Sequence, residues 1–331
     1  MSTVGIIANP ASGKDIRRLV AHATVVDNIE KVNLVRRILL GLQAVGVKQV
    51  LFMPDYFGIV PRALEGLTGQ FGLHMQVRYL EMPLTGGQTD SLVAAGMLAK
   101  QQVGCIIVLG GDGTSRIVAK GCGDVPILPV STGTNNVFPV MVEGTVAGLA
   151  AGLVAAGKVG RDNALNRMKK VAILVNGREV DIALVDAVVL DDQVIGSRAI
   201  WDVGKLRQIV ATRGDLTNIG IASIIGALHP LSPADSRGIA VELGAGGSRV
   251  LAAIGPGLIK PVQVAGYRLL NPGDKVVVKK VPCLIAVDGE REVEVRAGDR
   301  VELQMRSDGP WVVDLTAALN QAARQGLFQL E

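Results

Sequence analysis

Short aliphatic runs alternate with helical patterns through the first half of the chain, and this alternation limits the fold more than any other feature. The runs lie at 4–8, 50–53, 77–80, 105–109 and 127–130, with helical patterns at 27–42, 90–100, 116–120 and 145–156 between them. Runs rich in Val and Ile are typical of parallel strands buried on both faces. Strands that alternate with helices need crossover connections, so the first half is predicted to be an α/β domain with a doubly wound parallel sheet.

The second half has a different pattern. Apolar runs at 171–175 and 179–184 flank Asn176-Gly177, a dipeptide that tolerates the positive φ angles of a type I′ hairpin turn. Alternation at 292–296 predicts another strand. The segment from about 197 to 212 is interpreted as a helix. This half is therefore expected to be mainly antiparallel β.

These changes of pattern divide the chain into three parts. We predict an α/β nucleotide-binding domain over 1–165, a β-rich substrate domain over 166–314, and a C-terminal helix within 315–331 that packs back on the body. No Pro/Ser-rich or charged stretch marks a flexible linker.

Composition excludes several classes of protein. Hydrophobic residues make up 49% of the chain but aromatics only 3%, and the net charge of +4 is spread along the chain without a basic run, so nucleic acid is not an expected partner. No apolar stretch reaches the length of a membrane helix, and membrane insertion is not expected.

The N-terminus begins with a strand-like run in place of a signal peptide, which predicts a cytoplasmic protein. The three cysteines form no metal-binding pattern and are predicted to be buried thiols.

Three glycine-containing turns follow predicted parallel strands, at the edge where α/β sheets bind ligands. In the first, the backbone amides between Asn9 and Gly13 and the hydroxyl of Ser12 could hold phosphate oxygens, and Lys14 could supply charge. The turn is not a Walker A loop, because Asp15 stands where Ser or Thr would bind magnesium. An ordinary Asn-Pro/Ser-Gly turn is the alternative.

The second turn is Gly110-Gly111-Asp112-Gly113-Thr114. Its glycines allow the backbone to approach a polyphosphate and leave amides at a helix N-terminus, where anions are favoured. A carboxylate there would repel phosphate unless it holds a metal ion or accepts a proton from the attacking hydroxyl. Asp112 is therefore the first candidate for catalysis, and a possible Mg²⁺ ligand; the alternative is that it caps the helix.

The third turn, 131–136, carries Thr132, Gly133, Thr134 and Asn136. Its hydroxyl and amide groups suit recognition of a nucleotide, and capping of the next helix is the alternative. Arg116 stands where a dinucleotide fingerprint would have its third glycine, so that fingerprint is excluded.

The three turns also carry a family resemblance. The GGDGT at 110–114 resembles the signature of NAD kinases, diacylglycerol kinases and sphingosine kinases, and 9–13 and 133–138 resemble their flanking motifs. The stretches 287–290 and 298–301 resemble their late β-domain motif. Within this superfamily the sequence is most similar to the ATP-NAD kinase-like family of AcoX type, named after acetoin catabolism.

The resemblance implies an NAD kinase/diacylglycerol kinase-like fold that binds ATP in a cleft. It also implies Mg²⁺-dependent transfer of the γ-phosphoryl group to a hydroxyl of NAD or a related metabolite, and a homo-oligomer, either dimer or tetramer. We assign Asp112 to the acceptor hydroxyl or the metal, the amides of Gly111, Gly113 and Thr114 to phosphates, and Asn136 to the nucleotide. Glu290, on a predicted hairpin, is a second candidate catalytic carboxylate, and Asp186 is a candidate for ribose hydroxyls.

Several departures from the superfamily leave two alternatives open. Val185 replaces the Asn that precedes the acid in NAD kinases, and the hydroxyl-rich loop of those enzymes has at most a remnant without hydroxyls at 225–227. Val137 and Ile117 stand where lipid kinases have acids. The alternatives are a diacylglycerol-type lipid kinase and a regulatory protein that binds nucleotide without turnover.

Overall fold

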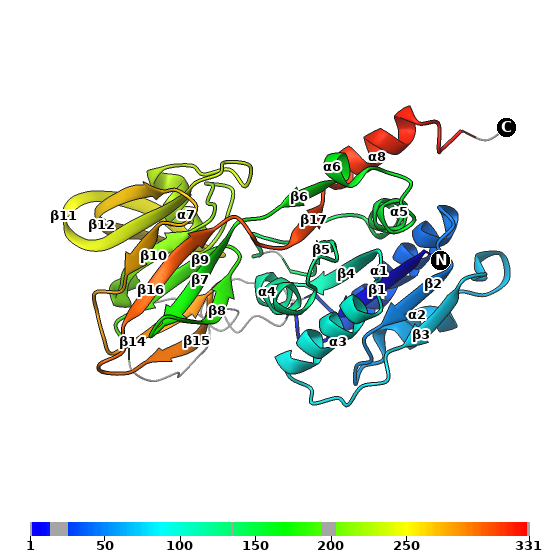
Figure 1. The fold of residues 1–331 in the computed structure, drawn as a ribbon, viewed down its shortest axis with the longest axis horizontal. Helices are drawn as coiled ribbons and strands as arrows, with labels where there is room; N and C mark the ends of the chain where they lie inside the picture. The colour runs from blue at the N-terminus through cyan, green and yellow to red at the C-terminus, as the bar shows by residue number, and fades with distance from the viewer. Residues whose placement is uncertain (1, 14–25, 134, 193–202, 330–331) are drawn as a thin grey trace.

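The chain folds into an α/β lobe and a β lobe (Figure 1). The structure is a computed structural model that describes residues 2–13, 26–133, 135–192 and 203–329. One lobe carries a mostly parallel sheet with helices on both faces, and the other carries two antiparallel sheets. The predicted fold class is confirmed.

The sheet of the α/β lobe has seven strands in the order β3-β2-β1-β4-β5-β17-β6. The strands are β1 (Thr3–Ala8), β2 (Gln49–Phe52), β3 (Gln76–Tyr79), β4 (Cys105–Gly110), β5 (Ile127–Ser131), β6 (Leu165–Arg167) and β17 (Trp311–Val313). All neighbours pair in parallel except β17 and β6. The five predicted N-terminal strands agree with β1 to β5 to within a residue or two, because buried aliphatic runs are a strong local signal.

Helices cover both faces of this sheet (Figure 1). One face packs α1 (Asn28–Ala44), α2 (Ile59–Glu65), α5 (Gly144–Ala155) and α8 (Leu315–Arg324), and the other packs α3 (Gln88–Lys100) and α4 (Asp112–Gly121). A short helix, α6 (Arg161–Ala164), precedes β6. Helix α1 begins where the sequence predicts, because the Asp27 side chain accepts a hydrogen bond from the Ile29 amide at 3.1 Å. Ile29 itself is 60% exposed, although it is apolar.

Two glycines let α1 and α5 approach closely. A Cβ atom at Gly41 would overlap the backbone of Thr145, and one at Gly148 would overlap the backbone of Ile38. The absence of side chains at this crossing therefore sets the distance between the two helices.

The β lobe contains a six-stranded sheet, β12-β11-β10-β9-β14-β15, and a four-stranded sheet, β13-β16-β7-β8. Their strands are β7 (Lys170–Val175), β8 (Arg178–Ala183), β9 (Asp186–Leu190), β10 (Leu206–Ala211), β11 (Gly238–Gly255), β12 (Leu258–Leu270), β13 (Lys275–Val277), β14 (Cys283–Val287), β15 (Glu290–Val295) and β16 (Val301–Arg306). Apolar residues of both sheets form one core, and α7 (Ile221–Leu228) packs on the other face of the larger sheet.

The predicted hairpin turn at Asn176-Gly177 is confirmed, with φ of 51° and 80° at the two residues. The predicted helix at 197–212 is wrong over 206–211, which form β10; residues 203–205 form a short 3₁₀ helix, and 193–202 lie outside the described residues. The apolar spacing there fits both a helix and a strand, and pairing with β9 and β11 decides for the strand.

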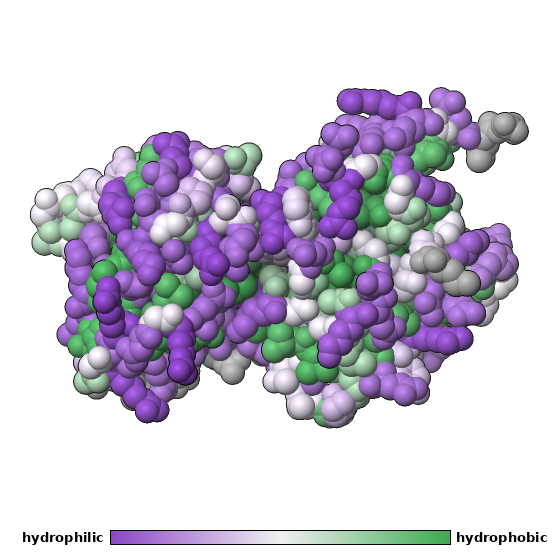
Figure 2. All heavy atoms as spheres, viewed as in Figure 1, coloured by the Kyte–Doolittle hydropathy of each residue, from purple (hydrophilic) through white to green (hydrophobic). Residues whose placement is uncertain are grey.

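The chain returns to the α/β lobe at its end. Strand β17 pairs with β5 and β6, and α8 packs against α5 and α6. Figure 2 shows the two lobes joined at a narrower waist, with apolar residues visible at the junction. In the described residues, no helix has the length and apolarity needed to span a membrane. All three cysteines are free and buried, as predicted.

Candidate functional site

The three predicted turns meet at one edge of the parallel sheet. Strand order reverses between β1 and β4, so the loops that follow these strands flank the crevice where such sheets bind ligands. The Asn9 amide group Nδ2 donates to Thr114 Oγ1 at 2.9 Å, and the hydroxyls of Ser12 and Thr132 are 2.9 Å apart. The structure therefore brings together residues from all three turns. Lys14 and Thr134 lie outside the described residues.

Glycines leave room for close contacts at this edge. A Cβ atom at Gly110 would lie 2.5 Å from the Cβ of Thr114, and one at Gly111 would lie 2.7 Å from Asn136 Oδ1. Gly13 adopts a φ of 79°, which L side chains rarely adopt. Helix α4 begins at Asp112, earlier than predicted, and Gly111 offers no side-chain cap to the first-turn amides. An anion could therefore approach these amides.

Lys31, which the sequence analysis missed, holds the first turn in place. Its ammonium group is buried and donates to Asn9 O at 2.9 Å, to Ser12 O, and to Asn28 Oδ1 at 3.0 Å. A signal was present in the sequence, because Lys31 lies one helical turn before Val35 on the buried face of α1. A buried ammonium group at this point places positive charge directly beneath the turn.

Asp112 ties the second turn to the third. Its carboxylate accepts hydrogen bonds from the Val137 amide at 3.0 and 3.1 Å and from the Phe138 amide at 2.7 Å. Asn136 contributes to the same loop by donating to Ser131 Oγ at 2.8 Å. Asp112 therefore orders the loop and also presents a carboxylate at the N-terminus of α4.

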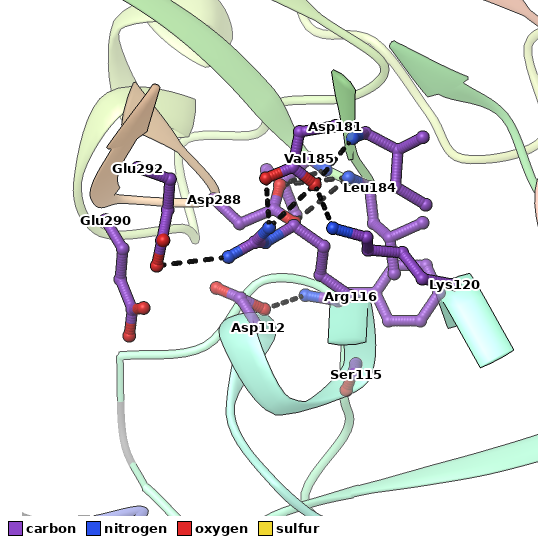
Figure 3. Close-up of polar contacts among 12 residues, drawn as sticks. Asp112, Ser115, Arg116, Lys120, Asp181, Leu184, Val185, Asp288, Glu290 and Glu292 are labelled. Carbon is purple, nitrogen blue, oxygen red and sulfur yellow. Dashed lines mark hydrogen bonds and ion pairs between the residues drawn. The ribbon is translucent and has the colours of Figure 1, made fainter. Parts of the chain in front are cut away.

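Glu290 comes from the β lobe and lies over the first turn of α4. Its Oε1 is 3.1 Å from where a Cβ atom at Gly113 would stand. Gln88, on α3, donates to Glu290 at 3.1 Å and to Glu292 at 3.2 Å. Figure 3 shows the carboxylates of Glu290 and Asp112 on the same side of the start of α4. The two predicted catalytic carboxylates thus lie at one site.

Asp288 forms the corner that carries Asp186. It sits at a φ of 51° in the β14–β15 turn, and its buried carboxylate accepts from the Leu184 amide at 3.0 Å and the Val185 amide at 2.7 Å. Burial raises the pKa of Asp288, and the charge of Arg116 opposes this shift. The sequence analysis gave Asp288 no role of its own. Its hydrogen bonds fix the β8–β9 corner, so Asp186 is held at the same crevice.

A buried arginine joins the two lobes beside this site (Figure 3). Arg116, only 1% exposed, directs Nη1 to both oxygens of Asp181 at 3.0 and 2.9 Å and Nη2 to Glu292 at 3.3 Å. Its Nε lies 3.9 Å from Asp288, and Lys120 donates to Asp181 at 2.9 Å. Arg116 and Lys120 share one face of α4, a spacing that could have indicated a common acidic partner.

A second buried arginine lies behind the acidic groups. The Arg213 guanidinium is 5.0 Å from the Phe138 ring centroid. Burial lowers the pKa of Arg213 to about 10, while the charges of Asp112 and Asp288 oppose that shift. Arg213 therefore supplies positive charge that balances these two carboxylates.

A pocket of about 40 Å³ opens between the lobes beside Asp112. Besides Gly220 and Gly289, it is lined by carboxylates, one amide and aliphatic side chains, namely Asp112, Asp186, Asp288, Asn135, Val137, Val185, Ile219, Ile221 and Ile254. Gly220, with a φ of 89°, begins α7 at this pocket. The predicted loop remnant at 225–227 is misplaced, because Gly226 lies within α7 against the backbone of Asp215 and Leu216.

Sequence comparison decides the family. Residues 4–159 match the ATP-NAD kinase N-terminal domain, and residues 169–308 match the Acetoin catabolism protein X C-terminal domain. The chain is 40% identical to Acetoin catabolism protein X of Cupriavidus necator in an alignment of 336 positions that covers 98% of this chain and 94% of that protein. The chain belongs to the acetoin catabolism protein X (AcoX) family. The resemblance drawn from the motifs is confirmed.

This AcoX-family chain is similar to the solved structure of a candidate diacylglycerol kinase of Bacillus anthracis. The similarity covers 94% of this chain and 97% of that chain, with a TM-score of 0.45 and 14% sequence identity. The ATP-NAD kinase domain at 4–159 makes this a kinase-type family.

Proposed function

We propose that this chain is a phosphotransferase that moves the γ-phosphoryl group of ATP to a hydroxyl of a small metabolite. The observation that carries the proposal is the meeting of three backbone-lined turns with the carboxylates of Asp112 and Glu290 at one crevice. The ATP-NAD kinase domain suggests NAD as the acceptor, and the name of the relative suggests a compound of acetoin catabolism.

Each turn has a task in this proposal. The first-turn amides of α4, at Gly113 and Thr114, would bind the phosphates together with the backbone of the 9–13 turn and Lys14. Asn136 and the hydroxyl of Thr132 would bind the nucleotide. Asp186 would hold a hydroxyl of the second substrate. Phosphoryl transfer depends mainly on such positioning and on neutralising charge.

The residues at the crevice are compatible with a Mg²⁺ ion that is bound chiefly by ATP. Within the described residues, no group of three His, Cys, Asp or Glu side chains is arranged to enclose a metal. Mg²⁺ is commonly held by one or two carboxylates together with phosphates and water. Asp112 and Glu290 provide two such carboxylates, whereas the oxygens of Asp288 already accept from backbone amides. When bound, the ion would neutralise charge on the β- and γ-phosphates.

The chemical step is an in-line displacement at phosphorus. The acceptor oxygen forms a bond to the γ-phosphorus, the bond to the β–γ bridging oxygen breaks, and ADP leaves. The hydroxyl proton passes to the carboxylate of Asp112 or Glu290. An ionised carboxylate has about four lone-pair sites, so Asp112 can accept this proton beside its backbone hydrogen bonds.

The test is ADP release by the full chain with ATP and Mg²⁺ across NAD, NADH, nucleosides, small diols and diacylglycerol. We expect Asp112→Asn to lower turnover by about 10²- to 10⁴-fold while ATP still binds. Asp124→Asn, whose side chain is 89% exposed, is the matched control. Gly111→Val should weaken ATP binding, because its side chain would meet Asn136. Unchanged turnover in Asp112→Asn would refute the assignment.

Regulatory nucleotide binding is the second candidate. It is favoured by the contacts that already occupy Asp112 and the hydroxyls of Ser12 and Thr132 within the protein. ATP binding without turnover on any acceptor would support it, whereas a preference for diacylglycerol would support a lipid kinase.

A further inference from the structure

The pocket beside Asp112 limits what the acceptor can be. It lies between the start of α4 and the start of α7, and Asp112 is one of its lining residues. A hydroxyl bound there would be next to the helix N-terminus that we assign to phosphate. The inference that follows therefore rests on the proposed function.

The walls of this pocket are aliphatic. Val137, Val185, Ile219, Ile221 and Ile254 line it, and Val185, Ile221 and Ile254 are almost fully buried. These side chains offer no hydrogen-bonding groups, so they favour methyl and methylene groups of a ligand. They contribute nothing that would recognise a sugar or a base.

The polar groups of the pocket favour a neutral alcohol. They are the carboxylates of Asp112, Asp186 and Asp288 and the amide of Asn135. Among the described residues that line the pocket, none is basic or aromatic; the buried cations Arg116 and Arg213 neighbour Asp288 without lining it. A carboxylate or phosphate on the ligand would meet like charges, whereas hydroxyl groups can donate to them.

The volume of the pocket limits how much of a ligand it encloses. A cavity needs roughly 10–15 Å³ to hold even one water molecule, so a pocket of about 40 Å³ encloses a small ligand only. A nicotinamide riboside or an acyl chain would extend out of the pocket. We infer that the acceptor is a compact, uncharged hydroxy compound of a few carbons, such as a short vicinal diol or hydroxyketone.

The experiment compares acceptors that differ in one property at a time. With the full chain, ATP and Mg²⁺, we expect propane-1,2-diol and butane-2,3-diol to be phosphorylated. Lactate, which replaces one alcohol group of propane-1,2-diol by a carboxylate, should be slower by on the order of a hundredfold in kcat/KM. The kcat/KM for hexane-1,2-diol should be lower than that for butane-1,2-diol by about tenfold or more. A preference for lactate, NAD or dioctanoylglycerol over the short diols would overturn the inference and leave the kinase proposal standing.

Substitutions of residues that line the pocket test the same inference. Ile221→Ala should raise the kcat/KM ratio of hexane-1,2-diol to butane-1,2-diol by about tenfold. Ile224→Ala is the matched control, because Ile224 is buried in the same helix but does not line the pocket. If Ile221→Ala fails to fold, the half-buried Val137→Ala takes its place. An unchanged ratio in the folded variant would overturn the inference.

A binding measurement separates the two proposals. Saturation-transfer NMR with a non-hydrolysable ATP analogue should detect butane-2,3-diol, and Ile221→Ala should alter the signal. Binding without phosphorylation would refute the kinase proposal while supporting the ligand class. Absence of both would overturn the inference.

Discussion

Arg116 and Asp181 form a buried ion pair across the junction of the two lobes, with Nη1 at 3.0 and 2.9 Å from the two carboxylate oxygens. Arg116 belongs to the helix that follows the glycine turn, and Asp181 belongs to a strand of the β lobe. The same guanidinium lies near Asp288 and Glu292. One side chain therefore links the start of α4 to the β14–β15 hairpin, which carries Glu290.

Removing Arg116 should destabilise the protein strongly. Arg116→Met leaves buried carboxylates without their cation, which typically costs about 3–5 kcal/mol. Urea unfolding should show the loss. Arg300→Met is the control, because the Arg300 side chain is 77% exposed in its pair with Glu302 and an exposed pair contributes about 1 kcal/mol or less. Equal effects of the two changes would contradict the proposed importance of this ion pair.

Substitution to alanine is expected to have opposite effects at two helix glycines. Gly41→Ala should lower the free energy of unfolding by about 1–3 kcal/mol, because the new methyl group would overlap the backbone of Thr145. Gly96→Ala lies in α3 with nothing within 4 Å of the added Cβ and should stabilise by about 0.5–1 kcal/mol. Chemical denaturation of both variants measures the difference. Stabilisation by Gly41→Ala would mean that the helices are free to separate.

Lys169 should make stability depend on pH. Burial, together with the nearby Arg213, lowers its pKa from 10.5 to about 8. Below pH 8 both the folded and unfolded states carry the proton, and the buried charge is unfavourable. Between about pH 8 and 10.5 the folded state releases the proton first, so stability relative to Lys169→Met should rise by about 1.4 kcal/mol per pH unit. Thermal or urea unfolding at several pH values measures this. The exposed control Lys260→Met should show no such difference from wild type, and a flat profile for Lys169→Met relative to wild type would contradict the shift.

The three thiols should be unreactive in the folded protein. Burial raises the pKa of Cys105 to about 12 and those of Cys122 and Cys283 to about 11. Since the thiolate is the nucleophile, a disulfide reagent at pH 8 should modify none of them quickly before unfolding and all of them in denaturant. Rapid reaction of one thiol in the native state would show that its segment opens.

Local patterns predicted much of this fold. Buried aliphatic runs identified β1 to β5, and Asn176-Gly177 identified a hairpin, because both signals act between neighbouring residues. The meeting of the three turns followed from their positions after parallel strands. The assignment of 206–211 to a helix was wrong, because that segment owes its strand structure to partners elsewhere in the chain.

The supporting side chains of the site were harder to predict. Arg116 pairs with Asp181, and Asp288 accepts hydrogen bonds from the β8–β9 corner. Both contacts join residues that are far apart in sequence. No periodicity indicates such partners. Lys31 was missed as well, although a charged residue on the buried face of a helix is visible in the sequence.

The return of β17 and α8 to the first lobe affects how the protein is made. Strand β17 inserts between β5 and β6, so the parallel sheet is incomplete until residues 311–313 have been synthesised. Domains usually fold as units during translation, N-terminal part first. Here the α/β lobe cannot complete its sheet until almost the whole chain has been synthesised, and the edge of β5 stays uncovered until then. Expression of 1–165 alone should therefore leave that edge open to aggregation.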